Sequence, residues 1–182
     1  MNFLSSKKFR FAGISLIGVV AIAAIVLAAT HNSKDSGKAV VSNSSNNSSG
    51  ASASTSDPSV SSKLGVEPVI GAPSGAAPTS LVKTDIVEGN GATALSSSTV
   101  TAQYVLMSWK TGKVLQSSWS SGPFTAPLSG VIPGWQQGIP GMKVGGRRLL
   151  VIPPALAYGA AGGGPVGPNE TLVFVVDLLG VK

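Results

Sequence analysis

The side chains that could act on a ligand lie between residues 104 and 174, and most of them are aromatic rather than ionisable. They are Tyr104, Phe124, Trp135, Tyr158 and Phe174. This region has no histidine, and its few acids stand near the ends of the last hundred residues. The chain also lacks cysteine, a GxSxG nucleophile elbow and any spacing typical of metal ligands. The sequence therefore argues against proton-transfer and metal chemistry, and we predict neither cofactor nor metal.

Four motifs follow one another in the second half of the chain. They are Val131-Ile132-Pro133-Gly134-Trp135, Gly141-Met142-Lys143-Val144-Gly145-Gly146-Arg147-Arg148, Ile152-Pro153-Pro154-Ala155-Leu156-Ala157-Tyr158-Gly159 and Thr171-Leu172-Val173-Phe174. In this order and spacing they resemble the FKBP-type peptidyl-prolyl cis-trans isomerases, the macrolide-binding immunophilins. The resemblance runs from about Leu81 to Lys182. It implies an enzyme that rotates X-Pro bonds, with proline-containing polypeptides as substrates and macrolides as inhibitors.

The resemblance also implies a set of pocket residues. Trp135 would form the floor beneath the proline ring, and the Tyr158 hydroxyl and the backbone N–H of Ile132 would donate hydrogen bonds to the bound peptide. The walls would be Tyr104, Leu115, Phe124, Val131, Ile132, Val166 and Phe174.

One polar position departs from the family pattern. Members of the family usually carry an aspartate directly after the wall residue, where this chain has Gln116. Glutamine keeps hydrogen-bonding capacity but loses the negative charge, so we expect slower turnover. Three hypotheses stay open: a working isomerase, a proline-peptide binding module or chaperone with little turnover, and a surface domain that only packs or adheres.

The elements that must position these residues follow from periodicity. Residues 99–109 and 172–179 alternate in the period-two pattern of β-strands, and 81–87, 113–118 and 147–152 predict three more. Pro133 begins, and Pro140 ends, a helix of about two turns. The predicted fold is α+β, a curved antiparallel sheet of about five strands wrapped around one short helix. Alternation should place Arg147 and Arg148 on opposite faces, one over the sheet edge and one solvated.

The N-terminal part predicts a membrane anchor and a spacer. Basic residues 1–10 precede an uncharged stretch, 11–29, which is long enough at about 1.5 Å per residue to cross a hydrocarbon core of about 30 Å. The charge asymmetry places the remainder outside the cytoplasm. Residues 30–79 are rich in Ser, Asn, Gly and Pro and predict a disordered linker before the isomerase domain, 80–182.

These features define the predicted location and partners. We expect a membrane-anchored bacterial form with an extracytoplasmic domain, secreted if the N-terminal segment is cleaved. From Lys83 onward the chain has seven basic and four acidic residues, which are scattered along the sequence. This small and dispersed excess of positive charge argues against nucleic-acid binding. We expect a monomer.

Overall fold

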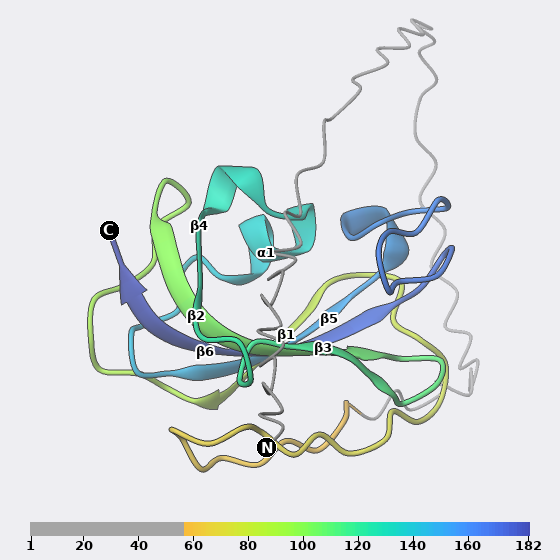
Figure 1. Cartoon of the computed structure of the whole chain (residues 1–182), viewed down its shortest axis with the longest axis horizontal. Helices are drawn as coiled ribbons and strands as arrows, with labels where there is room; N and C mark the ends of the chain where they lie inside the picture. Colours follow the sequence, from red (N-terminus) through yellow and green to blue (C-terminus); the bar gives the residue numbers. More distant parts are fainter. Residues whose placement is uncertain (1–56) are drawn as a thin grey trace, which may run out of the picture.

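The computed structural model describes residues 57–182, which form a six-stranded antiparallel sheet with one short α-helix above it (Figure 1). The path through the sheet is β1-β5-β6-β2-β3, and β4 pairs with β2 outside this path. The strands are β1 (Val82–Val87), β2 (Thr99–Ser108), β3 (Val114–Ser117), β4 (Phe124–Pro127), β5 (Arg147–Ile152) and β6 (Leu172–Val181). The helix is α1 (Pro133–Gly138), and two 3-10 turns are η1 (Leu128–Gly130) and η2 (Pro154–Leu156). The predicted α+β architecture is confirmed.

Alternation along the two longest strands divides their side chains between two cores. Val100, Ala102 and Leu106 of β2 join the cluster on the concave face, beneath α1. Met107 of β2 and Val173 of β6 join the cluster on the convex face. Both faces of the central strands are therefore buried, whereas the sequence predicted strands that were buried on one face only.

Two strand details were not predicted. The four residues of β4 pair with the first half of β2, as β3 pairs with its second half. Between Leu106 and Met107 the β2–β3 register shifts, because Leu106 faces Gln116 whereas Met107 faces Val114. Leu115 is therefore the extra residue of a β-bulge, and bulges re-aim side chains.

Helix α1 lies close to β5 because two glycines face that strand. A Cβ atom at Gly138 would stand 2.8 Å from a Leu150 methyl, and one at Gly134 would collide with Ile152. Pro133 stands at the first helical position, where its fixed φ favours helix initiation. The close approach fixes the height of Trp135 above the sheet.

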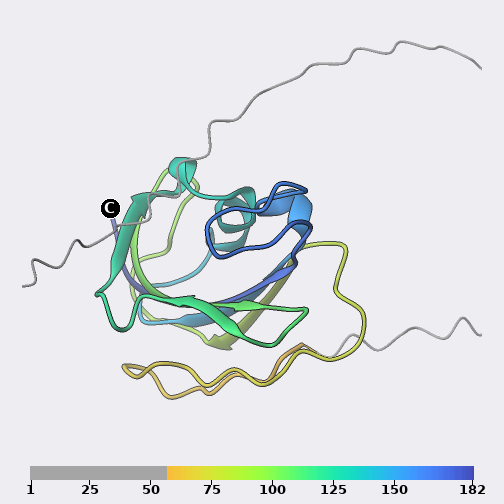
Figure 2. The same ribbon diagram turned by 45° about the vertical axis from the view of Figure 1, so that its right-hand side comes forward.

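The convex face is covered by residues 57–73, which we call the strap. It runs along the side of the sheet opposite α1 (Figure 1; Figure 2). Val60 and Ile70 pair in an antiparallel bridge, and both pack against the convex-face cluster. The expectation of a disordered linker up to residue 79 thus needs correction over 57–73, because apolar contacts and hydrogen bonds hold this segment on the sheet.

The two arginines also differ from expectation. They lie on opposite faces as alternation requires, but neither is solvated, since Arg147 is 0% and Arg148 is 8% exposed. Arg147 makes a bidentate pair with Asp177 at 2.6 and 2.7 Å, and Arg148 makes one with Asp85 at 2.7 and 2.9 Å. Paired carboxylates allow these cations to be buried.

The predicted basic segment, 1–10, the predicted span, 11–29, and linker residues 30–56 lie outside the described residues. Within 57–182 no helix is long and apolar enough to cross a membrane.

Candidate active site

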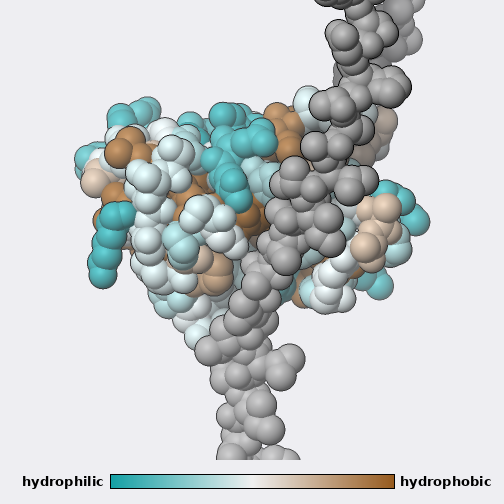
Figure 3. Space-filling view, turned by 90° about the horizontal axis from the view of Figure 1, so that it is seen from above, coloured by the Kyte–Doolittle hydropathy of each residue, from teal (hydrophilic) through white to brown (hydrophobic). Residues whose placement is uncertain are grey.

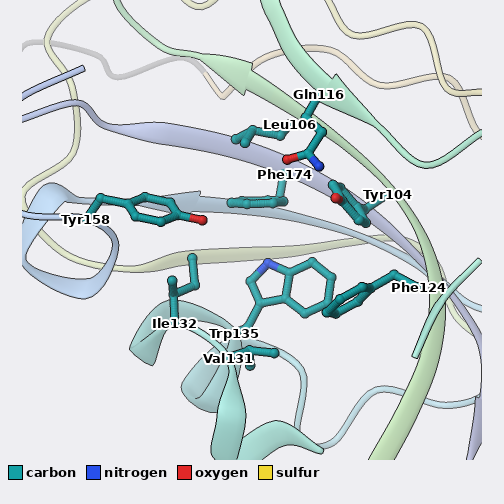
Figure 4. A pocket seen from close by; sticks show the side chains of 9 residues that line it. All are labelled: Tyr104, Leu106, Gln116, Phe124, Val131, Ile132, Trp135, Tyr158 and Phe174. Carbon is teal, nitrogen blue, oxygen red and sulfur yellow. The ribbon is translucent and has the colours of Figure 1, made fainter. Parts of the chain in front are cut away.

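A pocket opens on the concave side of the sheet, between α1, the sheet and the segment after η2. Seen from above, apolar residues gather near the middle of this face among more polar ones (Figure 3). Figure 4 shows the side chains that line the pocket. They are Tyr104, Leu106, Gln116, Phe124, Val131, Ile132, Trp135, Tyr158 and Phe174.

Trp135 is the floor of this pocket and is 3% exposed. Its ring meets three aromatic rings nearly at right angles, with centroids 5.7 Å from Tyr104, 6.0 Å from Phe124 and 5.5 Å from Phe174. Edge-to-face contacts of this kind stabilise a fixed arrangement of rings. The indole Nε1 is buried and has no hydrogen-bond partner among the described residues. The aromatic wall is therefore rigid while its floor keeps one unused donor.

Two hydrogen-bond donors belong to residues that line the pocket. The Tyr158 hydroxyl points into the pocket from the segment after η2 (Figure 4). The backbone N–H of Ile132, the residue that caps α1, has no partner within residues 57–182. The first N–H groups of a helix lack intrahelical acceptors, so this group can serve a ligand.

Burial raises the pKa of the Tyr158 phenol above its usual value. Burial, and secondarily the neighbouring Tyr158, raises the pKa of Tyr104 in the same direction. Both hydroxyls are therefore protonated across the neutral range, and each can donate a hydrogen bond.

Gln116 reaches the pocket from β3, and its amide lies between Leu106 and Tyr104 (Figure 4). The bulge explains why consecutive residues share this side of the strand, since Leu115 packs against the concave-face cluster as well. Gln116 is exposed to solvent. It is the one amide in an otherwise apolar and phenolic lining.

The structure brings together most of the predicted site residues. Leu115 and Val166 are exceptions, because both belong to the concave-face core and neither lines the pocket itself. Leu106 lines the pocket but was not predicted as a site residue. Its place on the same face of β2 as Tyr104 was the signal that could have identified it.

The lining matches the needs of amide rotation rather than bond cleavage. Within residues 57–182 no three His, Cys, Asp or Glu side chains are grouped so that they could hold a metal ion. Rotating an X-Pro bond breaks amide resonance, with a barrier of about 18–20 kcal/mol, and requires no nucleophile. An apolar slot with two fixed donors can desolvate the amide and hold its carbonyl oxygen while the ring turns.

Comparison with known proteins gives a consistent result. Residues 91–179 match the family described as FKBP-type peptidyl-prolyl cis-trans isomerase. A probable FK506-binding protein of Corynebacterium glutamicum is 49% identical over 114 residues, which cover 62% of this chain and 97% of that protein.

Solved structures agree in fold. The crystal structure of FkpA from Escherichia coli superposes with a TM-score of 0.54 at 44% identity, over 57% of this chain and 49% of that one. The crystal structure of AtFKBP13 gives 0.53 at 36% identity, over 58% of this chain and 96% of that one. With its aromatic pocket and its two donors, the chain belongs to the FKBP-type peptidyl-prolyl cis-trans isomerases.

Proposed function

We propose that this isomerase acts on exported polypeptides outside the cytoplasm, and that it is held at the membrane by residues 11–29. The observation that carries the catalytic part is the slot above Trp135, closed on its sides by aromatic rings and supplied with the Tyr158 and Ile132 donors. Uncatalysed X-Pro isomerisation takes tens to hundreds of seconds and can limit folding. An isomerase near the site of export would remove that delay.

The slot lowers the barrier by binding the twisted amide better than the planar one. A planar amide is more charge-separated, so an apolar site destabilises it relative to the twisted form. The proline ring lies over Trp135, and the Tyr158 hydroxyl and the Ile132 N–H hold the flanking carbonyl groups. Macrolides that present a comparable ring and carbonyl are the expected inhibitors.

Gln116 favours a second candidate function, which is proline-peptide binding with little turnover. By the resemblance to the family, the uncharged amide of Gln116 replaces an aspartate in the pocket lining, and a pocket without this charge would bind proline segments with little turnover. The chain would then act as a chaperone or binding module.

Isomerisation of a short X-Pro peptide by the full chain, followed by NMR exchange, separates these two functions. We expect measurable acceleration by the wild type and about a tenfold gain for Gln116→Asp, because a carboxylate would polarise the pocket more strongly. Gln116→Ala is the matched control and should not gain. Saturable peptide binding without acceleration by the wild type would assign the chain to the binding module.

The membrane location has its own test. We expect the full chain to sediment with membranes and its C-terminal domain to be digested by protease added from outside the cell. Replacing residues 11–29 with a cleavable secretion signal should release an active domain. A full chain that stays in the cytoplasm would contradict the location but not the isomerase activity.

A further inference from the structure

The strap is hydrogen-bonded to the sheet by the buried guanidinium of Arg147. Arg147 uses its Nε and Nη2 atoms on Asp177, and it also donates from Nη1 to the Ser61 carbonyl at 2.7 Å and from Nη2 to the Val66 carbonyl at 2.9 Å. Asp177 cannot satisfy these remaining donors alone, and a buried guanidinium is tolerated only when its donors are satisfied. The strap carbonyls therefore supply the hydrogen-bond acceptors that Arg147 needs in addition to Asp177.

Apolar contacts and backbone hydrogen bonds hold the same segment. Val60 and Ile70 pack on the convex-face cluster, and Ser61 N–H bonds to the Val69 carbonyl at 3.1 Å. Gly71 N–H returns to the Ser59 carbonyl at 2.8 Å. The strap thus has a fixed hairpin-like shape.

From the convex face the strap reaches β3. The Glu67 carboxylate accepts a hydrogen bond from the Ser117 hydroxyl at 2.6 Å. Near the other end of β3, a Cβ atom placed on Gly112 would lie 3.7 Å from Pro73. These two contacts place residues 67–73 beside the edge strand β3.

Strand β3 needs such support because its own pairing is short. Only three of its residues pair with β2, and a bulge interrupts them. The residue next to Ser117 is Gln116, which lines the pocket. Ser118, on the other side, accepts a hydrogen bond from the Tyr104 N–H through its hydroxyl at 2.8 Å. A shift of β3 would therefore move one pocket wall.

We propose that the strap positions β3, and with it Gln116, for catalysis, and that Arg147, Ile70 and Glu67 are the positioning residues that act through it. The functional unit then includes the strap in addition to residues 80–182. This proposal rests on the isomerase activity and is independent of the anchor and of the client proteins.

The test releases the strap with one substitution in the full chain. Ile70→Ser removes an apolar anchor, and Val69→Ser is its matched control, because Val69 is the preceding residue and is 74% exposed. Hydrogen exchange at the Gly71 and Ser61 amides measures docking, and near-ultraviolet circular dichroism checks the core. We expect faster exchange and a fall in kcat of about 3- to 10-fold at nearly unchanged KM for Ile70→Ser only.

Further variants separate positioning from general destabilisation. Glu67→Ala should lower kcat by a smaller factor without releasing the strap, whereas Glu67→Gln, whose amide oxygen can still accept from Ser117, should restore it. In a Gln116→Ala background, Ile70→Ser should lower kcat by a clearly smaller factor, because only the part of the wall next to Gln116 then remains to be displaced. An unchanged kcat with a released strap, or an equal loss in the Gln116→Ala background, would overturn the proposal.

Discussion

The two faces of one sheet differ in how completely they satisfy their polar groups. On the concave face Trp135, Ile132 and Tyr158 line the pocket, and the Trp135 Nε1, the Ile132 N–H and the Tyr158 hydroxyl have no hydrogen-bond partner among residues 57–182. On the convex face Arg147 is fully buried, and both Asp177 and the strap carbonyls accept from it. A face that binds a transient substrate must keep donors free, whereas the face that holds the strap in place must satisfy its donors.

The two faces also differ in packing, which leaves open space on the concave face and is closed on the convex face. The concave aromatic rings are held at centroid distances of 5.5–6.0 Å and leave space between them. The convex cluster, which includes Val151, Val173 and Val175, is closed by Val60 and Ile70 of the strap. Because β2 and β6 contribute alternate residues to both faces, the same two strands line the pocket on one side and pack against the strap on the other.

The largest expected effect on catalysis is on the concave face. Trp135→Leu should lower kcat/KM by about 100-fold, because the floor and its edge-to-face contacts are lost while an apolar core residue remains. Peptide isomerisation followed by NMR exchange measures it, together with urea denaturation. A variant with wild-type kcat/KM would show that the slot above Trp135 is not where the proline turns.

On the convex face the same degree of disruption should affect stability most. Arg147→Met leaves the Asp177 carboxylate buried without its partner and should lower the free energy of unfolding by about 3–5 kcal/mol. The double variant Arg147→Met with Asp177→Leu removes both charges and should recover most of that loss. Urea titration of the three proteins checks this. A double variant no more stable than the single one would mean that the ion pair itself, rather than the unpaired charge, determines stability.

A smaller effect is expected from one donor of the pocket. Tyr158→Phe removes a hydroxyl that has no partner within residues 57–182, so stability should change little. Loss of one neutral hydrogen bond to the bound peptide should lower kcat/KM by about 3- to 10-fold. Tyr104→Phe is the comparison, since that ring is part of the wall. Equal losses in both variants would indicate that the Tyr158 hydroxyl is not a specific donor.

The smallest effect is expected from pH. Burial raises the pKa of Tyr158 and Tyr104, so both phenols stay protonated up to at least about pH 9, and no pocket residue titrates between about pH 5 and 9. The unfolded phenols ionise near pH 10, so their contribution to stability is complete below that pH. It is lost as the pH rises through the folded pKa. A plot of kcat/KM that bends near pH 7 would contradict this assignment.

Most of the fold could be predicted because its signals are local. Alternation predicted β5 and β6, and Pro133 predicted the start of α1. The pocket residues were predicted through their resemblance to a family, since nothing in their spacing brings Tyr104 and Tyr158 together. These two residues come together only when strands that are distant in the sequence pair in the sheet.

The strap and the bulge could not be predicted for a common physical reason. The composition of residues 57–73, rich in Ser, Pro and Gly, is typical of a linker. Its docking depends on two aliphatic side chains and on backbone carbonyls that accept from Arg147, and carbonyls have no sequence signature. Leu115 and Gln116 share one side of β3 because of the bulge. The position of that bulge likewise depends on the register, which is set by pairing with β2.

The most direct test of the difference between the faces is an NMR titration of the full chain with a proline-containing peptide, using an alanine-for-proline peptide as control. We predict that the proline peptide alone shifts the Trp135 indole N–H and the Ile132 amide, while the amides of Ser61 and Gly71 in the strap do not move. Shifts confined to the strap, or equal shifts with the alanine peptide, would contradict the assignment of the concave pocket as the site of proline binding.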